Sequence, residues 1–448
     1  MTHLVEAKGA ALQALQDPVN LTGIQKVCLI VDVQGKLHVL ALLDDSAASS
    51  STASTLRSVL QRAAEDFWSG ELLLQRRKAH CEGRGNPADD LLFEAIWKEG
   101  KPAPLGQGRT FLLERRFSKE SWFDASSTPP WPLHPKTPRV VSFYSFKGGV
   151  GRTTALASVA LQLARSGQRV VLLDFDLEAP GLGSVFPPPS QIAPPLGLLD
   201  YLVEFPVLGV KFPLDDIFYA YDDQKALSAG EPIQVGWSGM PDEDYLAKLS
   251  RLNLHRLLAP LAVGGGTDDP IRHLLRFVKT EKRPDWILID SRAGLHDLGG
   301  LALSGLAHWH VLFGLDSSQS WAGLSVAVAR MGKLLVQANA PQADCLLVHA
   351  SVPPPPNAEV SKARFLARSH EVFSDLYYER PENDPEDKFY VLVDRDSTDA
   401  PHYPISLAHD LQVMGYQSAT EVADRLCEGD FNRLATILRS RVENSMPS

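Results

Sequence analysis

Short continuous apolar runs recur along residues 138–448, and most of them are followed by a stretch with helical spacing. Such runs are typical of strands that are buried on both faces of a parallel sheet. We therefore predict strands over residues 139–146, 168–176, 285–290, 310–315, 345–352 and 389–394. Strands that alternate with helices indicate a doubly wound α/β domain. The pattern thus predicts an α/β fold with a doubly wound, mainly parallel sheet over residues 138–448.

Two stretches add detail to this region. Behind the first predicted strand, apolar residues repeat at i, i+3, i+4 and i+7, which predicts a helix that packs by one face. These residues are Leu156, Val159, Ala160 and Leu163. Residues 187–270 are rich in proline and have no regular pattern, so we expect an insertion of loops and short helices there.

The pattern of residues 1–118 is different. Residues 26–43 indicate two strands joined at Gln34-Gly35, a hairpin-like turn signal. The serine-rich residues 46–55 are expected to form a loop. Residues 55–75 predict a helix, because they carry apolar side chains at helical spacing. These side chains are Leu56, Val59, Leu60 and Ala63.

A further strand is predicted over residues 109–117. Residues 1–118 are therefore expected to form a small α+β domain with a partner-binding or regulatory role. Residues 119–137 are rich in proline and serine and show no periodicity. We expect them to link the small domain to the domain formed by residues 138–448.

Composition limits the class of protein. A chain of 448 residues exceeds what one compact core usually covers. Its 44% hydrophobic and 22% charged content is ordinary for a globular protein. No apolar run is long enough to span a bilayer, and the first residues lack the layout of a signal peptide. The net charge of −10 and pI near 5.7 argue against a broad nucleic-acid-binding surface.

The spacing of the cysteines indicates the redox state of the compartment in which the protein is expected to lie. The four cysteines lie far apart and form no metal-type pair. They are Cys28, Cys81, Cys345 and Cys427. Scattered cysteines of this kind are typical of a reduced, cytoplasmic protein. We therefore expect a cytoplasmic location.

The sequence SFKGGVGRTT, residues 145–154, lies between the first predicted strand and its helix. The helix that begins near Thr153 contributes its partial positive end to an anion at this loop. Thr153 has the position that ligates Mg²⁺, and Thr154 is placed to contact an α-phosphate. Three glycines let backbone N–H groups turn toward phosphate oxygens. They are Gly148, Gly149 and Gly151.

This loop departs from the common phosphate loop, which reads G-x-x-x-x-G-K-[ST]. Phe146 stands in the place of the first glycine, and Arg152 stands in the place of the lysine. An additional lysine, Lys147, lies near the start of the loop. The departures raise the question of whether the loop binds and hydrolyses a nucleotide.

Acidic residues end two of the predicted strands. Asp174 and Asp176 end the strand over residues 168–176, and Asp290 ends the strand over residues 285–290. Ligands of parallel α/β sheets bind at the carboxyl ends of strands. We therefore expect all three carboxylates to lie near the glycine loop. One carboxylate can hold the metal, and another can orient the attacking water.

The segments KGGVGRTT, VVLLDFDLEAPGL and DWILIDSRAG resemble the deviant-Walker ATPases of the ParA/MinD class, which are P-loop NTPases of the SIMIBI type. The chain looks most like the branch whose loop reads KGGVGR in place of KGGVGK. The resemblance covers residues 138–316 well, the rest of the C-terminal domain loosely and residues 1–118 not at all. It implies ATP and Mg²⁺ as cofactors, ATP hydrolysis and a homodimer that sandwiches the nucleotides.

The resemblance also implies roles for matching residues. Lys147 matches the signature lysine that crosses the dimer interface, Arg152 matches the ordinary loop lysine, and Asp176 matches the carboxylate that positions the hydrolytic water. These three are the implied catalytic residues. The implied metal-site residues are Thr153, Asp174 and Asp290. The implied nucleotide-binding residues are Gly148, Gly149, Val150, Gly151, Arg152, Thr153, Thr154 and Gly294, the last at the second-switch position that senses the γ-phosphate.

Two arginines leave alternatives open. An arginine is larger and more rigid than a lysine, so Arg152 either slows hydrolysis and makes the protein a switch, or is simply accommodated with ordinary slow ATPase activity. Arg292 either approaches the γ-phosphate in cis, as arginine fingers do, or forms a surface ion pair. His296 and Asp297 follow it closely. Asp394 and Pro353 are candidates for framing the adenine base.

Three functions are compatible with these residues. The first is an ATP-driven switch that dimerises and signals to a protein partner through residues 1–118. The second is a scaffold that holds ATP and barely hydrolyses it. The third is an ATPase positioned on DNA or a membrane. The basic, amphipathic stretch around Leu434, Ile437 and Leu438 either lies on a membrane or packs on its own domain. No tyrosine follows Tyr416, so the tyrosine cluster of tyrosine-kinase relatives is missing.

Overall fold

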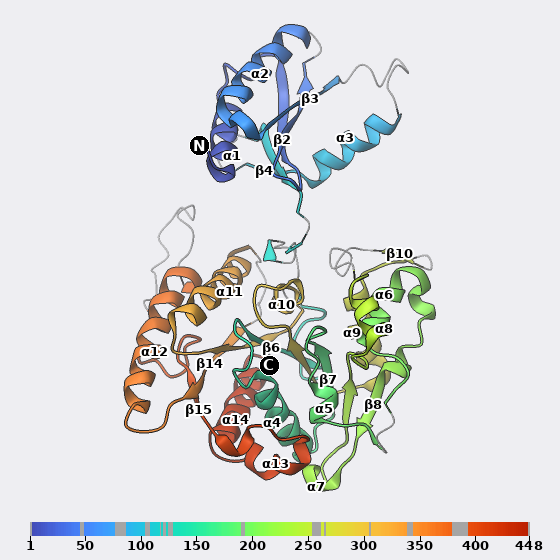
Figure 1. Cartoon of the computed structure of the whole chain (residues 1–448), viewed down its shortest axis with the longest axis vertical. Coiled ribbons are helices and arrows are strands. Elements are labelled where there is room, and N and C mark those ends of the chain that lie inside the picture. Colours follow the sequence, from blue (N-terminus) through green and yellow to red (C-terminus); the bar gives the residue numbers. More distant parts are fainter. Residues whose placement is uncertain are drawn as a thin grey trace. The chain divides into compact units, whose positions relative to one another are not determined.

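The chain forms two compact units, Met1–Phe117 and Ser118–Ser448 (Figure 1). A computed structural model describes residues 2–44, 49–76, 87–103, 108–116, 118–119, 122–123, 129–189, 193–252, 261–263, 266–303, 306–337, 344–378 and 393–446. None of the helices within these ranges is both long enough and apolar enough to cross a bilayer.

The N-terminal unit is built on a five-stranded sheet in the order β3-β2-β1-β5-β4. β1 and β2 form the predicted antiparallel hairpin, and Gly35 in its turn has a φ of +84°. β3 pairs parallel with β2, and β5 pairs parallel with β1. The strands are β1 (Ile24–Val31), β2 (Leu37–Leu43), β3 (Trp68–Arg76), β4 (Lys101–Pro102) and β5 (Thr110–Glu114). The helices are α1 (Leu4–Ala14), α2 (Ser49–Ala64) and α3 (Pro87–Glu99).

Two predictions for this unit are wrong in detail. The serine-rich stretch expected to be a loop is helical from Ser49 onward, within α2. Ala53, Leu56, Leu60 and Ala64 of this helix are all buried, and that burial outweighs the weak helix propensity of serine. The helix predicted over residues 55–75 ends at Ala64, and its second half becomes β3. Gly70, with a φ of +84°, is incompatible with a continuing helix.

The C-terminal unit contains an eight-stranded sheet in the order β15-β14-β13-β6-β12-β7-β9-β8. All neighbouring strands pair in parallel except β8 and β9. The predicted doubly wound, mainly parallel α/β fold is therefore confirmed. The strands are β6 (Arg139–Ser145), β7 (Val170–Phe175), β8 (Phe218–Tyr221), β9 (Ile233–Gly236), β12 (Trp286–Ser291), β13 (Trp309–Gly314), β14 (Asp344–Val352) and β15 (Ile405–Ala408).

Five of the predicted apolar runs correspond to β6, β7, β12, β13 and β14. Most of the sixth, residues 389–394, lies outside the described residues. The expectation of loops and short helices over residues 187–270 is wrong in one respect, since β9 and β8 extend the main sheet beyond β7. Each of these strands has only four residues. Runs this short give too weak a pattern to stand out in a proline-rich stretch.

Helices cover both faces of this sheet, because alternate residues of each strand point to opposite faces. One face packs on α4, α13 and α14, which lie beside one another (Figure 1). The other face packs on α6 and α9 at one end and on α11 and α12 at the other. The bounds are α4 (Arg152–Arg165), α6 (Leu198–Leu208), α9 (Pro270–Phe277), α11 (Ser318–Gln337), α12 (Ala358–Phe373), α13 (Ala419–Leu426) and α14 (Gly429–Asn444).

The amphipathic stretch near the C-terminal end forms α14. Its residues Leu434 and Leu438 are buried in the core that also contains α4, and Ile437 packs against that core. Of the two alternatives for this stretch, packing on its own domain is the one observed. The apolar face that a membrane would need is therefore already covered.

The segment expected to link the domains packs on the C-terminal unit where it is described. Trp131 is only 6% exposed. Its Nε1 donates to the Pro138 carbonyl at 2.8 Å, and its own carbonyl lies 2.8 Å from His308 Nε2. The tryptophan therefore anchors the described part of this segment to the C-terminal unit.

Candidate nucleotide-binding site

The glycine loop joins the end of β6 to α4, which begins at Arg152. Gly149 and Gly151 have φ values of +71° and +81°, and Gly151 is the N-cap of α4. A Cβ atom on Gly148, Gly149 or Gly151 would meet no heavy atom within 4 Å. Glycine is therefore required at 149 and 151 by the backbone conformation and not by crowding.

Phe146 occupies the place of the first glycine because α11 receives its side chain. Gly323 of α11 lies so close that a Cβ there would come within 2.1 Å of the Phe146 ring. The ring therefore rests directly on the helix backbone at Gly323. This contact fixes the residue that immediately precedes Lys147 in the loop.

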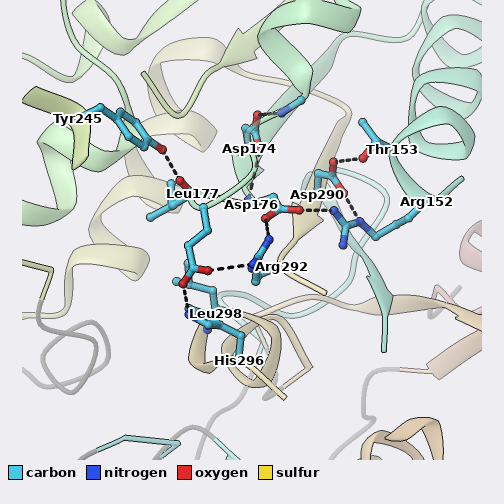
Figure 2. A network of polar contacts seen from close by, with 12 residues as sticks. Arg152, Thr153, Asp174, Asp176, Leu177, Tyr245, Asp290, Arg292, His296 and Leu298 are labelled. Carbon is cyan, nitrogen blue, oxygen red and sulfur yellow. Dashed lines mark hydrogen bonds and ion pairs between the residues drawn. The ribbon is translucent and has the colours of Figure 1, made fainter. Parts of the chain in front are cut away.

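Arg152 points at the strand-end carboxylates (Figure 2). Its Nε donates to Asp290 Oδ1 at 2.5 Å, and its Nη2 donates to Asp176 Oδ2 at 2.8 Å. Arg152 is 7% exposed. Burial alone would lower the pKa of Arg152, but the negative charges of Asp290 and Asp176 outweigh it and raise that pKa. The guanidinium is thus a buried cation shared between two acids.

Thr153 and Asp290 form the second polar contact of the loop. The Thr153 hydroxyl donates to Asp290 Oδ2 at 2.6 Å. Asp290 is the next-to-last residue of β12 and is fully buried. Burial raises the pKa of Asp290, while the charge of Arg152 opposes that rise. The two oxygens of this carboxylate are therefore divided between Arg152 and Thr153.

Thr153 and Asp290 fit a Mg²⁺ ion whose remaining ligands are phosphates and water. In the described part of the chain, no group of three or more His, Cys, Asp or Glu side chains is arranged to hold a metal ion by itself. Mg²⁺ in nucleotide sites typically takes one or two protein oxygens and completes its shell with phosphates and water. The adjoining oxygens of Thr153 and Asp290 supply that minimal set.

Asp174 was predicted to belong to the metal site, but in the structure its carboxylate accepts hydrogen bonds from backbone N–H groups. Its Oδ1 accepts the backbone N–H of Asp176, and its Oδ2 accepts those of Gly181 and Leu182 at 3.1 and 3.0 Å. Burial, together with the charge of Asp290, raises the pKa of Asp174 to about 7. These bonds shape the turn that follows β7. Metal binding by Asp174 stays a prediction.

Asp176 lies between two arginines. Its Oδ1 accepts from Arg292 Nη1 at 3.1 Å, while its Oδ2 accepts from Arg152. Arg292 also donates through Nη2 to Glu178 at 2.9 Å, and Glu178 lies 2.8 Å from His296 Nε2. Figure 2 shows the resulting chain of polar contacts from Arg152 to His296. The ion-pair alternative for Arg292 is the one observed, with its side chain 27% exposed.

Gly294 is bonded back to the end of β6. Its N–H donates to the Ser145 carbonyl at 3.0 Å, and its own carbonyl accepts the Tyr144 hydroxyl at 3.2 Å. Gly294 has a φ of +80°. The structure therefore brings the predicted second-switch residue beside the phosphate loop. Residues 292–297, which follow β12, are called the switch segment below.

Lys147 is half-buried, and among the described residues its ammonium group has no polar partner in this chain. The two candidates for framing adenine are not joined to the loop by any polar contact within the described residues. Pro353 follows β14, and the Asp394 carboxylate accepts the backbone N–H of Asp396 in a local turn.

Sequence reasoning missed two further residues at the site. The Tyr416 hydroxyl donates to Thr154 Oγ1 at 3.3 Å. Tyr416 precedes α13, far along the chain from the loop, and no motif surrounds it. Glu178 connects Arg292 to His296, and its position two residues after Asp176 was the only available hint.

Comparisons with known proteins agree with this site. Residues 138–180 match the family described as "AAA domain". The putative septum site-determining protein MinD of Oltmannsiellopsis viridis is 41% identical over 63 residues, which are 14% of this chain and 20% of that protein. The chloroplastic MinD homologue of Arabidopsis thaliana is 57% identical over 42 residues, which are 9% of this chain and 13% of that protein. The matches thus span at most 20% of the length of these relatives.

Among solved structures, the septum site-determining protein MinD of Pyrococcus horikoshii OT3, complexed with Mg-ADP, aligns with a TM-score of 0.35 and 19% identity. The alignment covers 51% of this chain and 77% of that chain.

A glycine loop between a parallel strand and a helix, with acidic residues at the ends of β7 and β12, defines a P-loop nucleotide-binding domain. Within that class, the chain is similar to MinD proteins over a short segment, and residues 138–180, which contain the extra Lys147, match the AAA domain family.

Proposed function

We propose that this protein is a Mg²⁺-dependent ATPase that hydrolyses ATP slowly and acts as a molecular switch. The observation that carries the proposal is the position of Arg152. It lies in a phosphate loop at the start of α4, yet its guanidinium is bound to Asp290 and Asp176. Backbone N–H groups of the loop and the start of α4 suit phosphate oxygens, while the ion pairs restrain the side chain expected to act on them.

We expect slow hydrolysis because the carboxylate of Asp176 is already bound by two arginines. Asp176 is the candidate for orienting water, but both its oxygens already accept from arginines. A carboxylate engaged in this way has less capacity to bind a water molecule. Removing one partner of a buried ion pair costs about 3–5 kcal/mol, so Arg152 leaves its acids only if phosphate oxygens replace them.

Thr153 and Asp290 would hold Mg²⁺ beside the phosphates. A bound Mg²⁺ supplies neutralisation of the charge that develops on phosphoryl oxygens. For Thr153 this requires that its hydroxyl, which now donates to Asp290, turn its lone pairs toward the metal. Gly148, Gly149, Val150 and Gly151 would contact the phosphates through their backbone N–H groups.

We further propose that ATP joins two copies of the chain. Lys147 is the candidate for reaching the partner's nucleotide, since in the described part of the chain it has no polar partner of its own. The N-terminal unit would then present the nucleotide state to a partner protein. The separation of the chain into two units supports such a division of roles.

A second candidate function is a scaffold that holds ATP without turnover. The observation in its favour is the double engagement of Asp176. A positioning role on DNA or on a membrane has less support, since the net charge is −10 and the apolar face of α14 is buried.

Single-turnover hydrolysis separates the switch from the scaffold. The full chain, in excess over radiolabelled ATP and with Mg²⁺ present, is followed for ADP over hours. A slow, complete conversion that EDTA abolishes supports the switch. Bound ATP that stays intact throughout supports the scaffold. ATP that is never bound contradicts both.

A further inference from the structure

The switch segment is bonded to the first described residues of the C-terminal unit. Both the backbone N–H and the Nζ of Lys119 donate to the Asp297 carboxylate, the latter at 3.0 Å. Trp122 Nε1 donates to the His296 carbonyl at 2.8 Å. Trp122 is 9% exposed, and its ring meets Tyr144 edge-on with a centroid distance of 6.1 Å. Two consecutive residues of the switch segment therefore hold Lys119 and Trp122.

The other end of the same segment is bonded to the nucleotide site. Gly294 donates to Ser145 at the end of β6, and Arg292 shares the Asp176 carboxylate with Arg152 of the phosphate loop. Tyr144 belongs to both groups of contacts, because its hydroxyl donates to Gly294 and its ring packs on Trp122. Six residues thus connect the phosphate loop to Lys119 and Trp122.

Lys119 and Trp122 lie just after the boundary between the two units of the chain. The N-terminal unit ends at Phe117, and the C-terminal unit begins at Ser118. Lys119 and Trp122 are therefore among the first residues by which the chain that leaves the N-terminal unit is attached to the nucleotide-binding unit.

We propose that the switch segment couples nucleotide binding to the attachment of the N-terminal unit, and that a bound triphosphate weakens its hold on Lys119 and Trp122. This inference rests on the proposed function, because it requires that the loop bind ATP. It adds the physical connection by which the N-terminal unit senses the nucleotide.

The direction of the effect follows from competition for donors. The Gly294 N–H cannot donate to Ser145 and to a phosphate oxygen at the same time. Likewise, if Arg152 turns toward a phosphate, Asp176 is bound by Arg292 alone. The ion pair of Arg292 with Glu178 then changes, and with it the contact of Glu178 with His296. Phosphate binding thus competes with the arrangement in which Lys119 and Trp122 are held. By reciprocity, loosening that hold favours ATP binding.

Fluorine NMR observes the hold directly. The full chain contains eight tryptophans, and uniform 5-fluorotryptophan gives each a resonance that a Trp→Phe variant assigns. Trp131 is the internal reference, since it is buried in the same proline-rich segment but donates to Pro138 instead of the switch segment. We expect a non-hydrolysable ATP analogue with Mg²⁺ to shift the Trp122 resonance relative to that of Trp131, and ADP to shift it less.

A matched pair of variants tests the reciprocal effect. The double variant Lys119→Ala, Trp122→Phe loses the contacts with the switch segment. The control Lys136→Ala, Trp131→Phe makes the same changes in the same segment, and Lys136 is exposed. We expect the first to bind ATP about fivefold more tightly than the unmodified chain, and the control to bind ATP unchanged. If the double variant does not fold, Lys119→Ala alone serves, since that side chain is 41% exposed.

The outcomes distinguish this inference from the proposed function. Binding of the ATP analogue with an unmoved Trp122 resonance, or with equal affinity in the test and control variants, overturns the coupling and leaves the ATP switch intact. Failure of the unmodified chain to bind any nucleotide overturns the proposed function together with the coupling.

Discussion

Arg152 donates through Nε to Asp290 Oδ1 at 2.5 Å, and both side chains are buried. In the common phosphate loop a lysine at this position reaches the β- and γ-phosphates. Here the cation at that position binds the acid that we assign to the metal site, and through Nη2 it also binds Asp176. The loop and its acids therefore form one charge network, in which a nucleotide must compete for Arg152.

We expect the Arg152→Lys variant to hydrolyse ATP about tenfold faster than the unmodified chain in single-turnover assays, a change of about 1.4 kcal/mol in the barrier. A lysine carries one ammonium group and cannot bind Asp290 and Asp176 as a fork does. Arg165→Lys, at the other end of α4, is the matched control. Turnover that falls or stays the same in Arg152→Lys shows that the arginine does not limit the rate.

The Gly323→Ala variant is expected to weaken ATP binding. Its new methyl group would lie 2.1 Å from the Phe146 ring, so the ring and the start of the phosphate loop must shift. Overpacking of this kind typically costs about 1–3 kcal/mol. Titration with a fluorescent ATP analogue measures the affinity, and Ala322→Ser, at the exposed neighbouring position, is the control. Equal affinities in the two variants would show that the Phe146 contact does not position the loop.

The sequence predicted the parts of this site that lie within short segments. The glycine loop is local. Asp176 directly follows β7 and Asp290 lies next to the end of β12, and both strands are continuous apolar runs, so the meeting of the two acids at one sheet edge follows from parallel topology. The Tyr416–Thr154 contact and the attachment of Trp122 to His296 join residues far apart in the chain. No periodicity encodes such contacts. The strands β8 and β9 were missed for a different reason, because each has only four residues and is too short to display a pattern.

Tyr416→Phe is expected to weaken ATP binding about two- to twelvefold, which corresponds to the usual net value of about 0.5–1.5 kcal/mol for one hydrogen bond. The lost hydroxyl donates to Thr154 Oγ1 at 3.3 Å and orients the residue predicted to contact the α-phosphate. Isothermal titration with ATP measures the change. Tyr403→Phe, which removes a hydroxyl elsewhere in the same unit, is the control. An unaltered affinity for Tyr416→Phe would remove Tyr416 from the site.

The contribution of His310 to stability is expected to fall as the pH is lowered from about 6.5 toward 3. Burial lowers the pKa of His310 to about 3, whereas an unfolded histidine has a pKa of about 6.5. Below that value the unfolded chain binds a proton that the folded chain does not, so the free energy of unfolding drops by about 1.4 kcal/mol per pH unit for this group. The loss begins near pH 6.5 and continues toward pH 3 as the pH is lowered.

Urea unfolding of His310→Gln and His409→Gln tests this expectation. His409 is exposed, so its replacement controls for the loss of a histidine as such. Asp174, with a pKa raised to about 7, acts in the opposite direction because its buried carboxyl gains stability by protonation as the pH falls. Asp174 is present in both variants, and its contribution cancels. A pH dependence that is the same in both variants would contradict the assignment to His310.

Binding of ATP by residues 145–154 is the proposal on which the other predictions depend. It is tested most directly by equilibrium binding of ATP with Mg²⁺ to the full chain and to Gly151→Val, since Gly151 has a φ of +81° that a β-branched residue adopts only under strain. We predict saturable binding by the unmodified chain that EDTA weakens, and its loss in Gly151→Val with the fold retained by circular dichroism. No saturable binding by the unmodified chain, or undiminished binding by Gly151→Val, would contradict the claim.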